Sequence, residues 1–493
     1  MAKYFGIDFG TTNSAVVQYD TRKALDPFRH VGGDDNEPIP SVVAVDNLTQ
    51  EVKVGRGVKD NLIRLREGDK HLVIESVKSL LDAAEIWPTP ARVWRPEDIA
   101  AELFAALSEK ARADVGEPIR EAVVAIPVGM SPAKRATLRR AARAAGVEII
   151  SFISEPTAAF IAHASELSHC RYAVVFDWGG GTLDISVLES RDGCVIERHI
   201  DGSPKAGDHI DLVVARWLHT QIAERYGLRL PFESVAPDER HALLTWAESI
   251  KRRLQRENSG EALIELGRYA GLNYVEQEIT AEVFDGLVAS IVTEALDRLI
   301  RSVEESRVSQ KEIGRLIVVG GTSNLSLLRR ELRRRWPQPN IIFPGGAEWD
   351  IARGAAWLAA HPGRHRMAEG LGLVLADDDY HDIFRTGTVS DEAAARLHFG
   401  LVEDTTTATF SFASRDGGAS PPSRLGELHV ESFGFRDETI KLACRITPDL
   451  VFEAEASSDS KRRSAAVFSY DRLRWMYEIP GDAREDGRRV KQA

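Results

Sequence analysis

The sequence predicts an α/β fold built from two similar halves, followed by a smaller all-β part. Three observations lead to this prediction. Strand-like and helix-like segments alternate from the start of the chain to about residue 360, as in α/β architectures. A strand–turn–strand pattern near residue 10 recurs near residue 180, which indicates duplicated halves. Beyond residue 370, short segments alternate between apolar and polar residues, as antiparallel strands do.

Six short apolar runs in the first part of the chain are typical of strands. They are YFGID (4–8), SAVVQYD (14–20), AVVAIP (122–127), YAVVFD (172–177), LDISVLE (183–189) and RLIVVGG (315–321). Amphipathic runs between them predict helices over 131–146, 209–227, 237–257 and 280–307. The first of these helices begins with Ser131 and Pro132, an N-cap residue followed by a proline at the first helical position, and closes at Gly146.

A change in composition after residue 362 divides the chain. We expect a first domain over 1–362, a linker over 363–370, a small β domain over 371–480 and a disordered polar tail over 481–493. Within the β domain, the run TIKLACRIT places Ile440, Leu442, Cys444 and Ile446 on one face. This alternation predicts a half-buried antiparallel strand.

Charge and cysteine content exclude several classes of protein. The net charge is −12, which argues against general binding to nucleic acid or to an anionic membrane. The basic run RRELRRRW (329–336) predicts a solvated helix face. The three cysteines are scattered without metal-ligand spacing, and no signal peptide or long apolar run is visible. A cytoplasmic location is therefore expected.

The two recurring hairpins share tips of glycine, threonine and aspartate. The glycines at 179–181 interrupt an apolar strand, which makes sense where backbone must approach another molecule. Two such tips on one cleft would wrap a polyphosphate with backbone N–H groups. Asp8 and Asp177 end their strands at these tips and could hold hydrated Mg²⁺. Either hairpin alone could be an ordinary turn, but the matched pair favours phosphate binding.

Five ordered motifs resemble the nucleotide-binding domain of DnaK-like heat-shock protein 70 chaperones. They are FGIDFGTTNSAVV, AIPVGMSPAKRATLRRAARAAGVE, ISEPTAAFIAH, VVFDWGGGTLDISVL and LIVVGGTSN, within residues 1–360. The resemblance implies a two-lobed, actin-like ATPase domain with the duplicated ribonuclease H-like fold. It also implies ATP or ADP and Mg²⁺ as cofactors, with K⁺ as a further candidate ion. Residues 371–480 resemble, more faintly, the family's peptide-binding β-sandwich, and the family's helical lid is not expected here.

The resemblance also implies site residues. The catalytic residues would be Lys78, Glu155, Asp177 and Thr182, with Lys78 and Glu155 on the γ-phosphate and the attacking water. The nucleotide would be bound by Asp8, Gly10, Thr11, Thr12, Asn13, Gly179, Gly180, Gly181, Thr182, Gly207, Glu248, Lys251, Gly320, Gly321, Asn324 and Glu348. Asp8 and Asp177 would hold Mg²⁺ through water. Pro127 and Arg135 match the family's proline switch and arginine relay.

Four residues and one segment depart from the family pattern. Asn324 replaces an arginine that stacks on the base, Gln255 replaces a serine and His209 replaces an acidic residue, so we expect weaker adenine affinity or relaxed base choice. Ser151 replaces the arginine that meets J-domain partners, and HRMAEG replaces the hydrophobic interdomain linker. Coupling to a J-domain protein is therefore not expected.

Two functions remain open at this point. The first is a chaperone-like protein that hydrolyses ATP slowly to ADP and phosphate, with nucleotide state controlling lobe closure and polypeptide binding. The second is a nucleotide-gated interaction module with little turnover, dedicated to one protein partner. A nucleotide exchange factor is a further candidate partner, and neither nucleic acid nor membrane is expected. A metabolite kinase is disfavoured because no second-substrate loop is recognisable.

Overall fold

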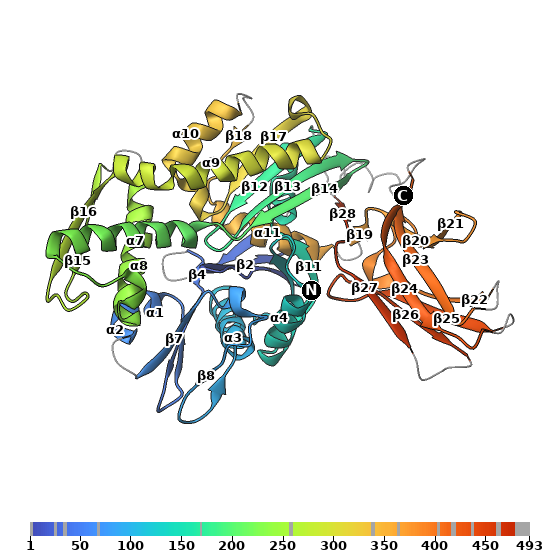
Figure 1. Cartoon of the computed structure of the whole chain (residues 1–493), viewed down its shortest axis with the longest axis horizontal. Helices are drawn as coiled ribbons and strands as arrows, with labels where there is room; N and C mark the ends of the chain where they lie inside the picture. Colours follow the sequence, from blue (N-terminus) through green and yellow to red (C-terminus); the bar gives the residue numbers. More distant parts are fainter. Residues whose placement is uncertain are drawn as a thin grey trace.

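Figure 1 shows a computed structural model of the chain. The structure describes residues 3–23, 27–32, 37–66, 70–167, 170–255, 260–336, 341–361, 365–401, 405–415, 421–434, 438–459 and 465–478. The predicted α/β class is confirmed, because helices pack against sheets that contain parallel strands. Within these ranges, no helix has both the length and the apolar character needed to cross a membrane.

Two large sheets share one strand order. The first sheet runs β11 (Glu148–Ser154), β10 (Glu121–Ile126), β1 (Tyr4–Asp8), β2 (Asn13–Tyr19) and β3 (Phe28–Val31), with β4 (Ile39–Pro40) paired to β2. The second runs β18 (Ile341–Ile342), β17 (Ile313–Val319), β12 (Tyr172–Trp178), β13 (Leu183–Arg191) and β14 (Cys194–Ser203), then continues into β28 (Trp475–Glu478) and β19 (His365–Met367). In each sheet the central strand, β1 or β12, has a parallel neighbour on one side and its own antiparallel hairpin partner on the other. The two repeated hairpins therefore occupy equivalent places.

The four predicted helices are confirmed. They are α4 (Pro132–Ala144), α7 (Gly207–Tyr226), α8 (Pro237–Leu254) and α9 (Ala281–Glu305). Local capping explains where two of them begin: the Ser131 hydroxyl accepts the backbone N–H of Lys134 at 3.3 Å, and the Thr280 hydroxyl accepts that of Val283 at 3.4 Å. The other α-helices are α1 (Arg56–Asp60), α2 (Leu62–Arg66), α3 (Pro96–Val115), α5 (Glu155–Ala162), α6 (Ala164–Leu167), α10 (Ser326–Arg335) and α11 (Ala347–Ala360).

Smaller elements surround the two sheets. Beside the first sheet lie β5 (Val42–Asp46), β6 (Val52–Val54), β7 (His71–Glu75), the 3₁₀ turn η1 (Val77–Leu80), β8 (Trp87–Pro88) and β9 (Val93–Trp94). The hairpin of β15 (Glu261–Leu266) and β16 (Val275–Thr280) packs on α7, α8 and α9. Helix α10 carries the basic run, and its arginines pair with carboxylates: Arg330 with Asp285 at 3.0 Å and Arg334 with Glu331 at 2.6 Å.

Two crossing helices join the sheets. Helix α5 follows the first sheet's β11 and packs on β12 and β13, whereas α11 follows β18 and packs on β1 and β2. The helices touch through a glycine: a Cβ on Gly354 would lie 1.9 Å from the carbonyl oxygen of Ala158. A Cβ on Gly6 would lie 2.0 Å from the backbone nitrogen of Ala356. Only glycine permits backbone contacts this close, so these two positions fix the spacing of the sheets.

The C-terminal strands form two further four-stranded sheets (Figure 1). One contains β21 (Tyr380–Phe384), β20 (Gly370–Val374), β23 (Thr407–Arg415) and β24 (Ser423–Glu431); the other contains β22 (Ala394–Gly400), β25 (Thr439–Ile446), β26 (Phe452–Ser458) and β27 (Ala466–Tyr470). The predicted alternation in β25 is confirmed, with Ile440, Leu442, Cys444 and Ile446 all buried. Residues 481–493 lie outside the described residues.

The expected linker and β domain both contribute strands to the second sheet. Residues 365–367 of the expected linker form β19, and β28 comes from the end of the expected β domain. β28 lies between β14 and β19, antiparallel to both. Helix α4 adds a second connection, because the Arg139 Nε lies 2.9 Å from Asp449 Oδ1 and Arg139 also donates to the carbonyl of Pro448 at 2.8 Å. Figure 1 shows β19 and β28 between the C-terminal sheets and the rest of the chain.

Candidate functional site

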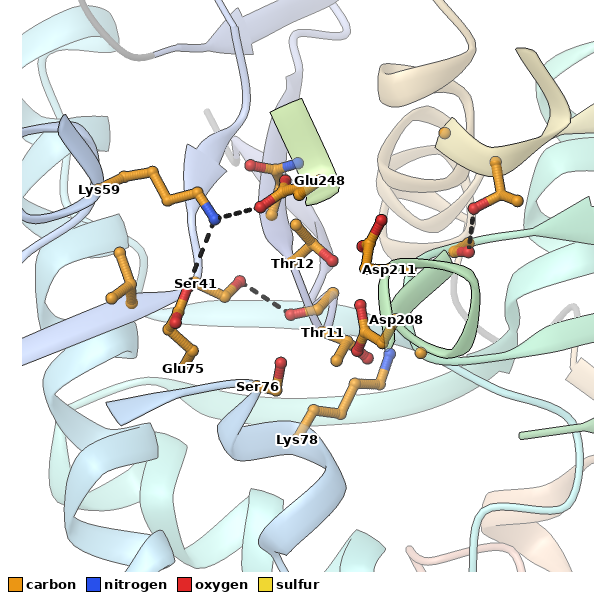
Figure 2. A pocket seen from close by; sticks show the side chains of 18 of the residues that line it. Thr11, Thr12, Ser41, Lys59, Glu75, Ser76, Lys78, Asp208, Asp211 and Glu248 are labelled. Carbon is orange, nitrogen blue, oxygen red and sulfur yellow. Dashed lines mark hydrogen bonds and ion pairs between the residues drawn. The ribbon is translucent and has the colours of Figure 1, made fainter. Parts of the chain in front are cut away.

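A cavity of about 920 Å³ opens between residues of the first and second sheets. It is lined by every expected nucleotide-binding or catalytic residue except Gly207. These are Asp8, Gly10, Thr11, Thr12, Asn13, Lys78, Glu155, Asp177, Gly179, Gly180, Gly181, Thr182, Glu248, Lys251, Gly320, Gly321, Asn324 and Glu348. Figure 2 shows the threonines of the first hairpin and Lys78 pointing into this space.

The tips of the two hairpins touch each other at the cavity. A Cβ on Gly180 would lie 2.1 Å from the Thr12 Oγ1, and a Cβ on Gly181 would lie 2.6 Å from the Thr11 Oγ1. The hairpins are therefore in van der Waals contact although about 170 residues separate them in the sequence. Larger side chains at these glycines would push the two tips apart.

Two other glycines and a threonine support the second tip. The carbonyl of Gly179 accepts the backbone N–H of Gly207 at 3.1 Å and the hydroxyl of Thr322 at 2.7 Å. Gly207 lies just behind the lining, where a Cβ would be 3.0 Å from the Lys251 Nζ. Gly320 has a φ of +86°, and a Cβ there would be 2.5 Å from Asp177 Oδ1. The backbone around the second tip is thus fixed by the start of α7 and by the turn that follows β17.

Four carboxylates and one ammonium group gather at the floor of the cavity, with Asp184 just behind the lining. Lys78, in η1, places its Nζ 2.5 Å from Glu155 Oε1 at the start of α5, and both side chains are buried. Asp177 and Asp184 are cross-strand neighbours in the second hairpin, and both are also buried. Asp8 ends β1 on the opposite side. Residues from both sheets therefore form one charged cluster.

Burial and mutual repulsion shift the pKa values in this cluster. Burial, with repulsion from Glu155, raises the pKa of Asp8 to about 7, although Lys78 opposes the shift. The pKa of Asp184 is raised to about 7 by burial and Glu155, against hydrogen bonds from the Thr182 hydroxyl and the Val128 N–H. The pKa of Asp177 rises well above its usual range for the same first two reasons. Burial alone would lower the pKa of Lys78, but attraction to Glu155 and Asp8 raises it.

The cluster fits a hard, hydrated cation. One ammonium group faces four carboxylates, and carboxylate and water oxygens are the ligands that Mg²⁺ prefers. A cation beside Asp8 and Asp177 would offset the repulsion that raises their pKa values. In the described part of the chain, no three His, Cys, Asp or Glu side chains come close enough to hold a metal ion directly. An ion here would be held through its water shell, which often remains on protein-bound Mg²⁺.

Charged pairs line the outer part of the cavity. Glu248 of α8 accepts from the Lys59 Nζ of α1 at 2.7 Å, and Lys59 also lies 3.3 Å from Glu75 (Figure 2). Lys251 pairs with Asp211 at 2.6 Å and donates to the carbonyl of Gly207 at 3.2 Å. The Lys59–Glu248 pair joins α1, beside the first sheet, to α8, which packs on α7 and β15. Glu248 and Lys251 do share a helix face, as their spacing predicts.

Several lining residues escaped the sequence analysis. They are Ser41, Lys59, Arg66, Glu75, Asp208, Asp211 and His241, among others. Asp184, which lies behind the lining in the charged cluster, was missed as well. Asp184 carried a usable signal, because the glycine-rich tip has an aspartate on each side. Lys59, Glu75 and Asp211 carried none, since isolated charged residues on helices and edge strands are usually solvated.

The expected switch residues lie between the cavity and the C-terminal sheets. Pro127 precedes Val128, whose N–H donates to Asp184 Oδ1 at 2.9 Å. Arg135 is buried in α4, with its guanidinium 3.9 Å from Asp471. Among the departures, Gln255 lines the cavity and Asn324 accepts a hydrogen bond from Arg329 at 2.6 Å.

A comparison with protein-family models gives the assignment. The model described as "Hsp70 protein" matches residues 70–360. The matched span holds Lys78, Glu155 and the second hairpin, and it covers more than half of the chain. The cavity, its two hairpin tips and this match agree, and the chain therefore belongs to the Hsp70 family.

Proposed function

We propose that the chain is an ATPase of two-lobed, actin-like architecture, in which the first and second sheets form the lobes and the cavity binds ATP with Mg²⁺. The contact between the two hairpin tips carries the proposal. Backbone N–H groups in glycine-rich turns bind phosphate oxygens, and two touching tips can hold one polyphosphate from both sides. Membership of the Hsp70 family supports the same function.

The chain's own groups divide the work between binding and hydrolysis. The tips at 10–13 and 179–182 would bind the phosphates, and Glu248 and Lys251 at the outer end would meet the nucleoside. Lys78 would neutralise charge on the γ-phosphate, while Glu155 would orient the attacking water, so that ATP and water give ADP and phosphate. When bound, Mg²⁺ would neutralise phosphate charge, with Asp8 and Asp177 holding it through water.

The Lys78–Glu155 pair also gives a reason to expect slow turnover. The two groups are 2.5 Å apart and buried, so each neutralises the charge of the other. Either group must leave its partner to meet phosphate or water, and separating a buried ion pair is unfavourable. We therefore expect hydrolysis to be slow relative to nucleotide binding.

We further propose a chaperone-like output, in which nucleotide state controls lobe closure and the C-terminal β domain binds a polypeptide in the cytoplasm. Two sheets of the expected domain enclose an aromatic core that includes Phe412 and Phe468, stacked at 4.8 Å. β19, β28 and the Arg139–Asp449 pair connect this domain to the ATPase lobes. Movement of the lobes can therefore reach the domain by direct contact.

Single-turnover hydrolysis tests the enzymatic part of the proposal. The native chain should convert bound ATP to ADP and phosphate, and Lys78→Ala should remove most of this rate because the buried cation is lost. Lys53→Ala is the matched control, because Lys53 is exposed and pairs loosely with Glu51 at 3.6 Å. Equal rates for native protein and Lys78→Ala would refute the ATPase proposal.

The second candidate function, a nucleotide-gated module with little turnover for one fixed partner, is favoured by a different observation. The C-terminal β domain is joined to the second sheet by two paired strands, a connection suited to a fixed arrangement. This candidate predicts ATP binding in calorimetric titration without Lys78-dependent hydrolysis. Hydrolysis that depends on Lys78 would exclude it.

A further inference from the structure

A buried carboxylate lies behind the helix that carries Glu155. Glu197, in β14, is only 4% exposed. Its Oε1 accepts hydrogen bonds from the Ser154 Oγ and the Thr157 Oγ1, each at 2.5 Å. A third hydrogen bond reaches the carboxylate from the backbone N–H of Trp475, in β28. Glu197 thus joins the start of α5 to the last described strand.

The two hydroxyl donors flank Glu155 in the first turn of α5. Ser154 is the N-cap residue of this helix, but its side chain makes no capping bond to the helix backbone. The hydroxyl that would usually cap the helix is instead held by Glu197. Ser154 and Thr157 are three residues apart and share one face, while Glu155 reaches Lys78 in the cavity. Glu197 therefore fixes the rotation of the first turn about the helix axis.

Strand β28 completes this arrangement from the other side. Val195 and Ile196 of β14 pair with Tyr477 and Met476, next to Glu197. Trp475 and Tyr477 are buried, and their side chains join the same apolar cluster as Val195. Ion pairs from Arg366 to Glu478 at 3.1 Å and from Arg474 to Glu369 at 3.0 Å fasten the strand to residues 365–369. Without β28, β14 would be an edge strand and Glu197 would lose one of its three donors.

We propose that Glu197 is a positioning residue for Glu155, and that β28 is a structural part of the ATPase which holds Glu197 in place. The hydrolytic part of this inference rests on the proposed function. Because the three hydrogen bonds place the helix start and not the phosphate-binding tips, their loss acts on the chemical step and leaves ATP affinity unchanged. A displacement of about 1 Å at a catalytic group can lower a rate by about a hundredfold.

The test compares Glu197→Gln and Met476→Pro with matched controls in the full chain. Met476→Pro removes a backbone N–H from β28, whereas Met476→Ala keeps it. Glu189→Gln controls for loss of a buried carboxylate, because Glu189 lies on β13 at 2% exposure and its ion pairs are with Arg171 and Arg198, not with residues of α5. We expect both test variants to lower the single-turnover rate constant by about tenfold or more, with the Kd for ATP unchanged. Both controls should hydrolyse at the native rate.

Hydrogen exchange at the amides of residues 155–162 provides a readout that does not need hydrolysis. Both test variants should speed exchange in this segment, and the controls should not. If the native chain shows no Lys78-dependent hydrolysis, the proposed function fails, and the exchange result alone decides the role of Glu197. Native rates and native exchange in Glu197→Gln would overturn the inference. Should Met476→Pro fail to fold, Arg366→Ala takes its place as the test of β28, because it removes the ion pair that fastens Glu478 to residue 366. Thr157→Val is then a second test of Glu197, because it removes one donor to that carboxylate while keeping the side-chain shape.

Discussion

The ion pair across the mouth of the cavity predicts how fast a bound nucleotide leaves. Lys59 on α1 and Glu248 on α8 are 2.7 Å apart, and each side chain is about one-fifth exposed. The two helices belong to opposite walls, so the pair must break when the walls separate. Replacing Lys59 with methionine keeps the length of the side chain and removes the charge. We expect this variant to release nucleotide faster.

The magnitude follows from the surroundings of the pair. Exposed pairs contribute roughly 0.2–1 kcal/mol, and partial burial strengthens the attraction. Lys59 also contacts Glu75, but Glu75 has a second ion-pair partner, Arg66, at 2.8 Å, and this partner remains in the variant. Burial raises the pKa of Glu248, but Lys59 and, to a smaller extent, Lys251 hold it below its usual range. In the variant Glu248 keeps the attraction of Lys251. A net loss of about 1 to 2 kcal/mol is therefore expected, which changes the opening equilibrium about fivefold to thirtyfold.

Stopped-flow release of a fluorescent ADP measures this effect directly. Lys59→Met should raise the dissociation rate constant about fivefold or more. At higher salt concentration, the rate constants of the variant and of the native chain should become more similar, because salt screens the ion pair. Lys53→Met provides the control, because its pair with Glu51 is exposed and lies 3.6 Å apart. A dissociation rate within about twofold of the native value would refute the assignment of this pair to cavity closure.

Three further predictions concern stability and domain contact. Gly354→Ala should lower the free energy of unfolding by about 3 kcal/mol in denaturant titration, because the new Cβ would clash with the Ala158 carbonyl. Gly286→Ala is the control and should not lower it, because a Cβ there would have no neighbouring atom within 4 Å. Because burial and Glu155 raise the pKa of Asp8 from 3.8 to about 7, folding takes up a proton there, so the stability of the nucleotide-free chain falls as pH rises through this window. Asp8→Asn should flatten that fall in calorimetry at several pH values. Arg139→Ala should speed proteolysis within 371–480, because it removes the 2.9 Å pair with Asp449.

The features that the sequence predicts well are local. The two tips are recognisable from glycine, threonine and aspartate within a few residues, and the N-cap Ser131 marks a helix start that the structure reproduces. Such signals depend on backbone conformation and on nearest neighbours, so they can be found without knowledge of the packing. The duplication of the hairpin likewise predicts two sheets of one strand order.

The outer wall of the cavity and the docking of β28 depend on packing between distant segments. Lys59 and Glu248 are 189 residues apart, and neither has a local pattern that would link it to the other. β28 has only four residues, and its pairing with β14 joins segments about 280 residues apart. The sequence shows that Asn324 stands where the family has an arginine. It does not show that Arg329 hydrogen-bonds to Asn324 or that the Arg329 guanidinium lies 4.6 Å from the ring centre of Phe343.

The geometry of the site and the stability of the fold depend on the same contacts. Gly354 and Ala158 set the distance between α11 and α5, and each of these helices packs on the sheet opposite to the one it follows. A change in that distance therefore moves the two sheets and, with them, the tips at Thr12 and Gly180. It also moves Glu155, because that residue is the first of α5. A substitution at Gly354 should consequently impair nucleotide binding even at temperatures where the protein remains folded.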